Sequence, residues 1–375
     1  MRKTQVALAA LALMASTAAL AEVKISGQID IGVFNTGNST AGAGGTYMEQ
    51  GGYLDHSSVT LSVNEDLGSG LKVGAVLESG FNANGAIDNG GNQGATTTNG
   101  ATGSTQGSGQ VGLWNRQSYM YVGGDFGTVG LGKQLSPYIL SMALTNGGFG
   151  TFWVPRLAVG GAGAFAGGGI GNHAVGFFIP NAVTYTTPSI NGFTVSAMTT
   201  TASGTLYNNM NQNRGSQDAD KYTSWSISGN VGDIFVSGAW QKRGGSASDA
   251  TPSTGYKSWM LGATMPLMAG LSAFGSYDSH KAEGAADNVN SYGFGVKYML
   301  SEATALQAGY AANDQSGTAE KTLTNVALIH ALSKRSSVYA TAGRGKNTGS
   351  AVGNFGSTYT GLTNNTYGVG VAHSF

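Results

Sequence analysis

Residues 23–33 read VKISGQIDIGV, in which apolar or small side chains alternate with polar ones. Successive side chains of a β-strand point to opposite faces of the sheet, so this stretch predicts a strand with one apolar and one polar face. Lys24, Ser26, Gln28 and Asp30 share the polar face. The same alternation returns along the chain up to the last residue, in 59–63, 71–77, 193–197, 234–240, 292–298 and 367–375. The chain is therefore predicted to be all-β.

The composition excludes several classes of protein. Gly is frequent, at 62 of 375 residues, but there is no Gly-X-Y period and only 6 Pro, which excludes collagen. The 14 Phe, 16 Tyr and 5 Trp exclude a disordered chain. Only 10% of the residues are charged, whereas ordinary soluble domains have about 25%. Part of the folded surface is therefore expected to face lipid rather than water.

Residues 1–21 have the features of a cleaved secretory signal peptide. Arg2 and Lys3 precede the apolar run 6–13, and 19–21 form an A-x-A cleavage site. A membrane anchor is the weaker alternative, because the run is shorter than the roughly 20 residues of a span. The remaining residues, 22–375, are predicted to form one domain.

Residues 22–375 have 17 basic and 19 acidic residues, a net charge of −2, which argues against nucleic acid as a partner. The chain has no Cys, so disulfides cannot stabilise it. No stretch after Ala21 approaches 18 consecutive apolar residues, which excludes helical membrane spans. An exported chain with alternating strands and no apolar helix is consistent with a membrane protein that crosses lipid with strands.

Short and long connections alternate between the predicted strands. The short ones resemble tight turns and are 65–70, 123–127, 188–192, 230–233, 266–270 and 333–336. Long tracts rich in small and polar residues include 82–115 and 135–180. Outer-membrane barrels have short turns at one end and long loops at the other. At roughly 22 residues per strand and connection, the chain has room for about sixteen strands, which enclose an aqueous channel. The predicted fold is a transmembrane antiparallel β-barrel.

The rival all-β interpretation is a secreted β-solenoid or a surface adhesin. Such proteins show a fixed repeat of 20–50 residues, and none is visible here. The chain also ends on Phe375, an aromatic residue in register with the apolar face of its last strand, instead of an atypical cap. Both observations favour the barrel.

Several stretches closely resemble one family, the general porins of the proteobacterial outer membrane, above all their β-proteobacterial branch. They lie in the family's order along the whole mature chain and are EDLGSGLK at 65–72, LESGF at 77–81, RQSYMYVG at 116–123, GDFGTVGLGKQLSP at 124–137, LSKRSSVY at 332–339 and GVGVAHSF at 368–375.

The resemblance implies a homotrimer of water-filled barrels in the Gram-negative outer membrane, which passes ions and small hydrophilic solutes by passive diffusion without a cofactor. The implied partners are outer-membrane lipid, lipopolysaccharide and the barrel assembly machinery. The machinery would recognise the C-terminal strand, whose assembly signal would be Tyr367, Val369, Val371, His373 and Phe375.

In this family the third extracellular loop folds inward and narrows the pore, and acidic residues on it usually face basic residues on the wall. The tract 135–180 occupies that position and shows no obvious secondary structure. Its constriction residues are predicted to be Phe149, Phe152, Trp153, Arg156 and His173. The tract contains no Asp or Glu, so we expect weak anion preference or a constriction tuned by aromatic walls.

The candidate residues of the constriction wall follow from the resemblance and the alternation. Arg116 and Lys133 occupy positions where the family has basic wall residues. Lys133 shares a side with Leu131, so facing inward requires a bulge or a protein-covered outer face. Alternation places four further residues on the lumen side, as constriction or as ordinary lining: Lys72, Glu78, Gln28 and Asp30.

Catalytic and metal sites find no support in the sequence. The five His are scattered without ligand spacing, no Cys is present, and no G-x-S-x-G motif occurs. We therefore expect no enzyme. Two alternatives remain, a solute-specific channel in which 82–115 and the aromatic loop bind the solute, and a barrel enzyme with polar groups at its rim.

Overall fold

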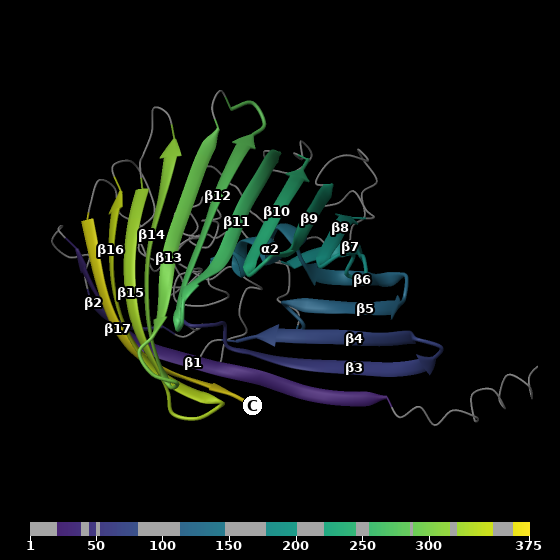
Figure 1. The fold of residues 1–375 in the computed structure, drawn as a ribbon, viewed down its shortest axis with the longest axis horizontal. Helices are drawn as coiled ribbons and strands as arrows, with labels where there is room; N and C mark the ends of the chain where they lie inside the picture. The colour runs from purple at the N-terminus through teal and green to yellow at the C-terminus, as the bar shows by residue number, and fades with distance from the viewer. Residues whose placement is uncertain are drawn as a thin grey trace, which may run out of the picture.

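The computed structural model describes residues 21–38, 45–49, 53–81, 113–146, 178–200, 221–244, 255–285, 288–315, 321–347 and 363–375. These residues form one closed antiparallel sheet with a short helix beside it (Figure 1). The predicted signal peptide lies outside the described residues except for Ala21. No helix in the described ranges is long and apolar enough to cross a membrane.

The elements are β1 (Glu22–Asn38), β2 (Gly45–Glu49), β3 (Ser58–Gly68), β4 (Leu71–Gly80), β5 (Gln117–Gly124), β6 (Gly127–Leu135), α2 (Pro137–Leu144), β7 (Phe178–Thr186), β8 (Phe193–Thr200), β9 (Tyr222–Val231), β10 (Ile234–Arg243), β11 (Tyr256–Met268), β12 (Leu271–Ala282), β13 (Val289–Met299), β14 (Thr304–Gln315), β15 (Lys321–Ala331), β16 (Ser336–Asn347) and β17 (Thr363–Ser374).

The sheet closes on itself through β1, which pairs with β17 on one side and with β3 on the other. From β3 to β17 every strand pairs with the next one in the chain. The short strand β2 also lies along β1, beyond the end of β3, so β2 and β3 are two pieces of one wall strand. The barrel thus has sixteen wall positions, and the predicted antiparallel barrel of about sixteen strands is confirmed. Closure leaves no unpaired sheet edge in the lipid.

All six predicted tight turns join consecutive strands at one end of the barrel. The turn between β7 and β8 shows why asparagine and glycine mark such turns. Asn191 has φ 53° and Gly192 has φ 84°, the left-handed pair that a two-residue hairpin turn requires. A further short connection, residues 300–303, joins β13 to β14 at the same end. The connections at the other end lie largely outside the described residues.

The alternation separates an apolar outside from a polar inside. Ile25, Leu261 and Val369 on the outer face are 67%, 61% and 60% exposed. Ser237 and Gln241 on the inner side of β10 are buried, while their neighbour Trp240 points outward. The two-faced strands predicted from the sequence are therefore confirmed. An apolar outer band is what a barrel presents to lipid.

The tract 135–180 contains more regular structure than its sequence indicates. Strand β6 runs to Leu135, helix α2 follows it, and β7 begins at Phe178. Ser136 caps the helix by accepting a hydrogen bond from the Ile139 N–H at 3.2 Å, and Pro137 occupies the first turn. These are standard signals for a helix start. The expectation of no secondary structure was wrong here, because the helix is only eight residues long and buried on most sides.

Candidate functional site

A pair of opposite charges lies on the lumen side of β4 and β5. Glu78 is on the polar face of β4, and Arg116 directly precedes β5, which pairs with β4. Arg116 Nε donates to Glu78 Oε1 at 2.5 Å, and Gln117 Nε2 donates to Oε2 at 2.6 Å. The guanidinium also lies over the Phe178 ring, 4.7 Å from its centroid. The structure thus joins two of the predicted wall residues in an ion pair that offsets the positive charge of Arg116.

Gln28 and Asp30 both face the lumen side of β1, but neither serves as simple lining. Gln28 Nε2 donates to the carbonyl of His56 at 2.7 Å. The carboxylate of Asp30 is buried and accepts three backbone N–H groups of residues 53–55. Both side chains hold the segment between β2 and β3, so Asp30 does not act as an exposed charge in the lumen.

Asp55 is on that segment, outside the strands, and part of its side chain is exposed. The Asp55 carboxyl lies within electrostatic range of the Arg116 guanidinium. His56 N–H donates to Asp55 Oδ1 at 2.7 Å. Asp55 therefore belongs to the same charged cluster as Arg116 and Glu78. Neither composition nor alternation identifies Asp55, since it lies between strands.

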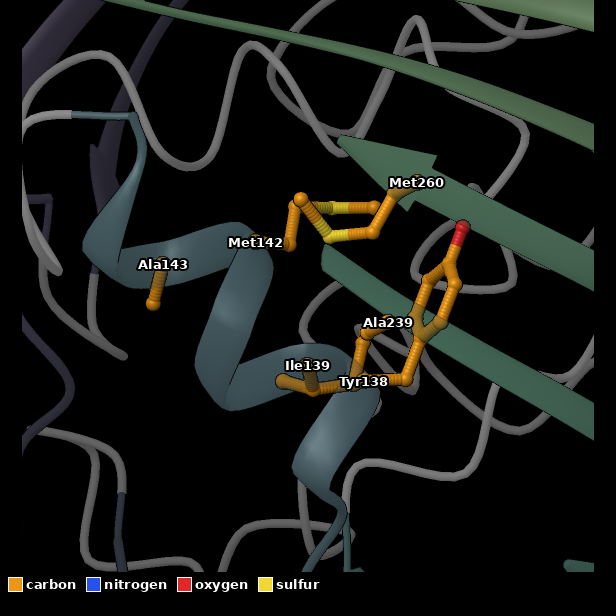
Figure 2. Close-up of a cluster of buried hydrophobic side chains, with 6 residues drawn as sticks. All are labelled: Tyr138, Ile139, Met142, Ala143, Ala239 and Met260. Carbon is orange, nitrogen blue, oxygen red and sulfur yellow. The ribbon is translucent and has the colours of Figure 1, made fainter. Parts of the chain in front are cut away.

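Helix α2 packs against the inner face of the wall at β10 and β11 (Figure 2). Tyr138, Ile139 and Met142 are buried against Ala239 of β10 and Met260 of β11. Ala239 and Met260 are buried while the side chains next to them in sequence point outward, so this contact lies on the lumen side. Each buried side chain of this size contributes about 1.5–3 kcal/mol. The chain that leaves β6 thus lies inside the barrel against β10 and β11.

The end of α2 is also fixed to the wall by polar contacts. Asn146 exchanges hydrogen bonds with the Ser276 hydroxyl at 3.0 and 3.1 Å. Thr264 Oγ1 donates to the carbonyl of Leu144 at 3.1 Å. Thr145 lies directly over Gly262, where an added Cβ would come within 2.4 Å of the Thr145 hydroxyl. Gly262 is therefore required for this close approach.

The predicted loop residues Phe149, Phe152, Trp153, Arg156 and His173 lie outside the described residues. Of the aromatic residues that the sequence assigned to the tract, Tyr138 is buried on α2 and Phe178 lies beneath Arg116. The inward course of the whole loop remains a prediction, whereas its first part, up to Asn146, is seen to contact the inner wall.

The two lysines of the predicted wall take no part in this ion pair. Lys72 is exposed, six residues from Glu78 on β4 and close to the turn, which is about 20 Å along the strand. Lys133 pairs with Ser118, which shares a side with the exposed Met120. Its ammonium donates to the backbone carbonyl of Asn115. We therefore leave both lysines out of the proposed constriction.

The C-terminal strand β17 completes the closure of the barrel. Phe375 N–H donates to the Gly27 carbonyl at 2.9 Å, and Gly27 N–H donates back at 3.1 Å. Tyr367, Val369 and Val371 are exposed on the outer face. His373 shares a 2.9 Å hydrogen bond with the Ser336 hydroxyl. The last residue thus extends the ladder between β17 and β1.

Solved structures with the same fold include an anion-selective porin from Comamonas acidovorans, with 20% identity, a TM-score of 0.70 and coverage of 95% of this chain and 100% of that one. OmpT of Vibrio cholerae has 14% identity, a TM-score of 0.61 and coverage of 96% and 99%. OmpF of Salmonella typhi has 12% identity, a TM-score of 0.59 and coverage of 95% and 98%.

Among curated protein sequences, none matches the chain. The family model described as Gram-negative porin matches residues 7–350. The match covers most of the barrel, including Arg116, Glu78 and helix α2, and it agrees with the closed sheet of sixteen wall positions. This chain therefore belongs to the Gram-negative porin family.

Proposed function

We propose that this outer-membrane diffusion channel passes ions and small hydrophilic solutes with weak charge selectivity. The observation that carries the proposal is the 2.5 Å pair of Arg116 with Glu78, because a paired charge attracts passing ions less than a free one. The sequence of the loop adds no acidic residue. The Comamonas porin is described as anion-selective, which supports a residual preference for anions here.

Reversal potentials across planar bilayers test this proposal. Purified protein under a KCl gradient should give a chloride-to-potassium permeability ratio slightly above one. Clear cation selectivity would contradict the proposal. Liposome swelling with neutral and charged solutes is the second measurement. Uptake ordered by solute size supports a general pore, and saturable uptake would instead identify a solute-specific channel.

The functional unit is proposed to be a homotrimer. A structure of OmpT is described as a trimer form, and two features of this chain support the same assembly. Strands β5 to β8 have only 8 or 9 residues, at or below the roughly 9 residues that a strand needs to cross lipid, which suits a protein-covered face. An apolar groove also runs over the outside of β1 and β15–β17, lined by Ile31, Val33, Leu328, Val338 and Val369. Mass measurement of the detergent-solubilised protein should give three copies.

Outer-membrane lipid and lipopolysaccharide are the proposed partners of the outer face. Lys242, Lys257 and Lys281 lie opposite one another on β10, β11 and β12. One step nearer the middle of the barrel, Trp240 and Trp259 form a similar pair. Aromatic residues mark the membrane interface, so the lysines lie at the level of lipid phosphates. The variant Lys242→Glu/Lys257→Glu should retain less lipopolysaccharide on purification than Lys334→Glu, which changes a turn at the other end.

The barrel assembly machinery is proposed to recognise the last strand through its exposed apolar side chains and Phe375. The ladder between Phe375 and Gly27 supports this, because the final residue takes part in closure. Deletion of Phe375 should reduce the amount of folded protein in the outer membrane while leaving synthesis unchanged.

A further inference from the structure

The wall strand formed by β2 and β3 contains surplus residues. Gly32 of β1 pairs with Glu49, and Gln28 pairs with Ser58. Four steps along β1 thus correspond to nine steps from Glu49 to Ser58 along the β2–β3 wall strand, a surplus of five residues. An interruption this large is no ordinary β-bulge, which inserts one residue.

Residues 53–57, which lie in this interruption, fold to the inside of the barrel. Tyr53 is 2% exposed and packs against Phe34 and Tyr339, with ring centroids 5.2 and 5.5 Å away. Its hydroxyl lies 2.7 Å from Thr341 Oγ1 and accepts a hydrogen bond from Asn325 Nδ2 at 2.9 Å. These partners are on the inner face, because the side chains next to them in sequence point outward.

Asp30 holds the inward segment to the wall. Its Oδ2 accepts the backbone N–H groups of Tyr53, Leu54 and Asp55 at 2.9, 2.5 and 3.1 Å. Its Oδ1 accepts the hydroxyl of Tyr339 at 2.8 Å. Hydrogen bonds to a carboxylate are roughly twice as strong as those between neutral groups. The Ser57 hydroxyl accepts from the Asp30 N–H at 3.0 Å and donates to the Asp30 carbonyl at 3.1 Å, where a strand partner is missing.

This segment lies at the height of the charged pair. Phe81 N–H donates to the Ser57 carbonyl at 3.0 Å, and Arg116 N–H donates to the Glu78 carbonyl at 3.1 Å. Residues 57 and 116 therefore both adjoin the same few residues at the end of β4. Asp55 retains an exposed side chain there, within electrostatic range of Arg116.

We propose that residues 53–57 form a second constriction element, in which Asp55 is the selectivity-determining side chain and Asp30 the positioning residue. The inference rests on the proposed channel function. A second acid near Arg116, besides Glu78, thus comes from an inward fold of the barrel wall, in a chain whose long loop contains no acid. Asp55 lowers the preference for anions that Arg116 would otherwise produce, and Asp30 keeps Asp55 at that height.

The absence of cysteine from the natural chain makes a direct test possible. In Asp55→Cys the single thiol is modified with a methanethiosulfonate reagent carrying either a sulfonate or a trimethylammonium group, during recording in a planar bilayer. Asp55→Cys should raise the chloride-to-potassium permeability ratio about fourfold, the effect of one charge about 6 Å from a passing ion at 0.1 M salt. The anionic reagent should restore the wild-type ratio, and the cationic one should raise the ratio further.

Asp233→Cys is the matched control, because Asp233 is an exposed acid in the turn between β9 and β10. Its labelling should change the ratio less than labelling at residue 55. Modification of Asp55→Cys that is complete by mass but leaves the conductance and the ratio unchanged would overturn the proposal. Absence of conductance in the unmodified wild type would instead overturn the channel function itself.

The role of Asp30 is tested in the same background. Asp30→Asn removes the charge and replaces one acceptor oxygen with an NH2 donor, so it should release the segment and reduce the change in permeability ratio on labelling residue 55 at least twofold. Tyr339→Phe removes one donor only and should produce a smaller reduction in a barrel that still folds. Folding is checked by the mobility of unheated samples on gels. An undiminished effect of labelling on the ratio in folded Asp30→Asn or Tyr339→Phe would contradict the positioning role.

Discussion

Replacing Glu78 with glutamine removes one charge of the pair without changing the shape of the side chain. Glu78 accepts Arg116 Nε at 2.5 Å and Gln117 Nε2 at 2.6 Å. Glutamine keeps an oxygen for one of these donors, and the Phe178 ring still supports the guanidinium at 4.7 Å. The positive charge of Arg116 therefore remains in place without its closest counter-charge.

The expected size of the effect follows from Coulomb's law. An ion that passes about 6 Å from one unit charge in water changes its energy by about 0.7 kcal/mol, and screening at 0.1 M salt reduces this to about 0.4 kcal/mol. This corresponds to about twofold enrichment of chloride and about twofold depletion of potassium at the pair. The chloride-to-potassium permeability ratio should therefore rise about fourfold in Glu78→Gln.

Reversal potentials of the purified variant under a KCl gradient measure this ratio. Glu302→Gln is the matched control, since Glu302 is exposed in the turn between β13 and β14 and far from Arg116 in the strand order. The double variant Glu78→Gln/Arg116→Gln should return close to the wild-type ratio, because both charges are gone. An unchanged ratio in Glu78→Gln, or a shift toward potassium, would refute the argument that the pair offsets Arg116.

Three further perturbations test the contacts that shape the lumen and close the barrel. In Gly370→Ala the new Cβ would come within 2.2 Å of the Tyr339 ring. We therefore expect the free energy of unfolding, measured in urea, to fall by about 1–3 kcal/mol. Unaltered stability would contradict this packing. Asn146→Ala removes both hydrogen bonds to Ser276, each worth about 1 kcal/mol. Because the end of α2 should then move more, the open-channel current should become noisier. Quiet currents in that variant would show that α2 is held by its apolar face alone. Deletion of Phe375 removes two ladder hydrogen bonds, and folded barrel on unheated gels should decrease.

Alternation in the sequence predicted most of the fold. The strand period of two assigned Lys24, Gln28 and Asp30 to one face and the apolar residues between them to the other, and the structure confirms both faces. Glycine and asparagine marked the tight turns because few other residues adopt their backbone conformations, as at Asn191 and Gly192. Helix α2 was missed, although Ser136 followed by Pro137 is a local signal for a helix start.

The site was predicted less completely than the fold. Arg116 and Glu78 were both identified as wall residues, but nothing in the sequence showed that they pair, because they are 38 residues apart. Asp30 was expected to line the lumen, whereas its carboxylate is used to fix residues 53–57. Asp55 carries no signal in the sequence, since its position depends on five residues that have no strand partner.

The sequence by itself determined which side chains face lipid and which face the lumen, since the direction of a side chain on a strand depends only on its position in the alternation. Only the tertiary structure decided which charges meet. The pairing of Arg116 with Glu78, the inward fold held by Asp30, and the contact of α2 with Met260 all depend on strand register and on closure of the sheet. These distances arise between distant parts of the chain, and no local pattern of residues encodes them.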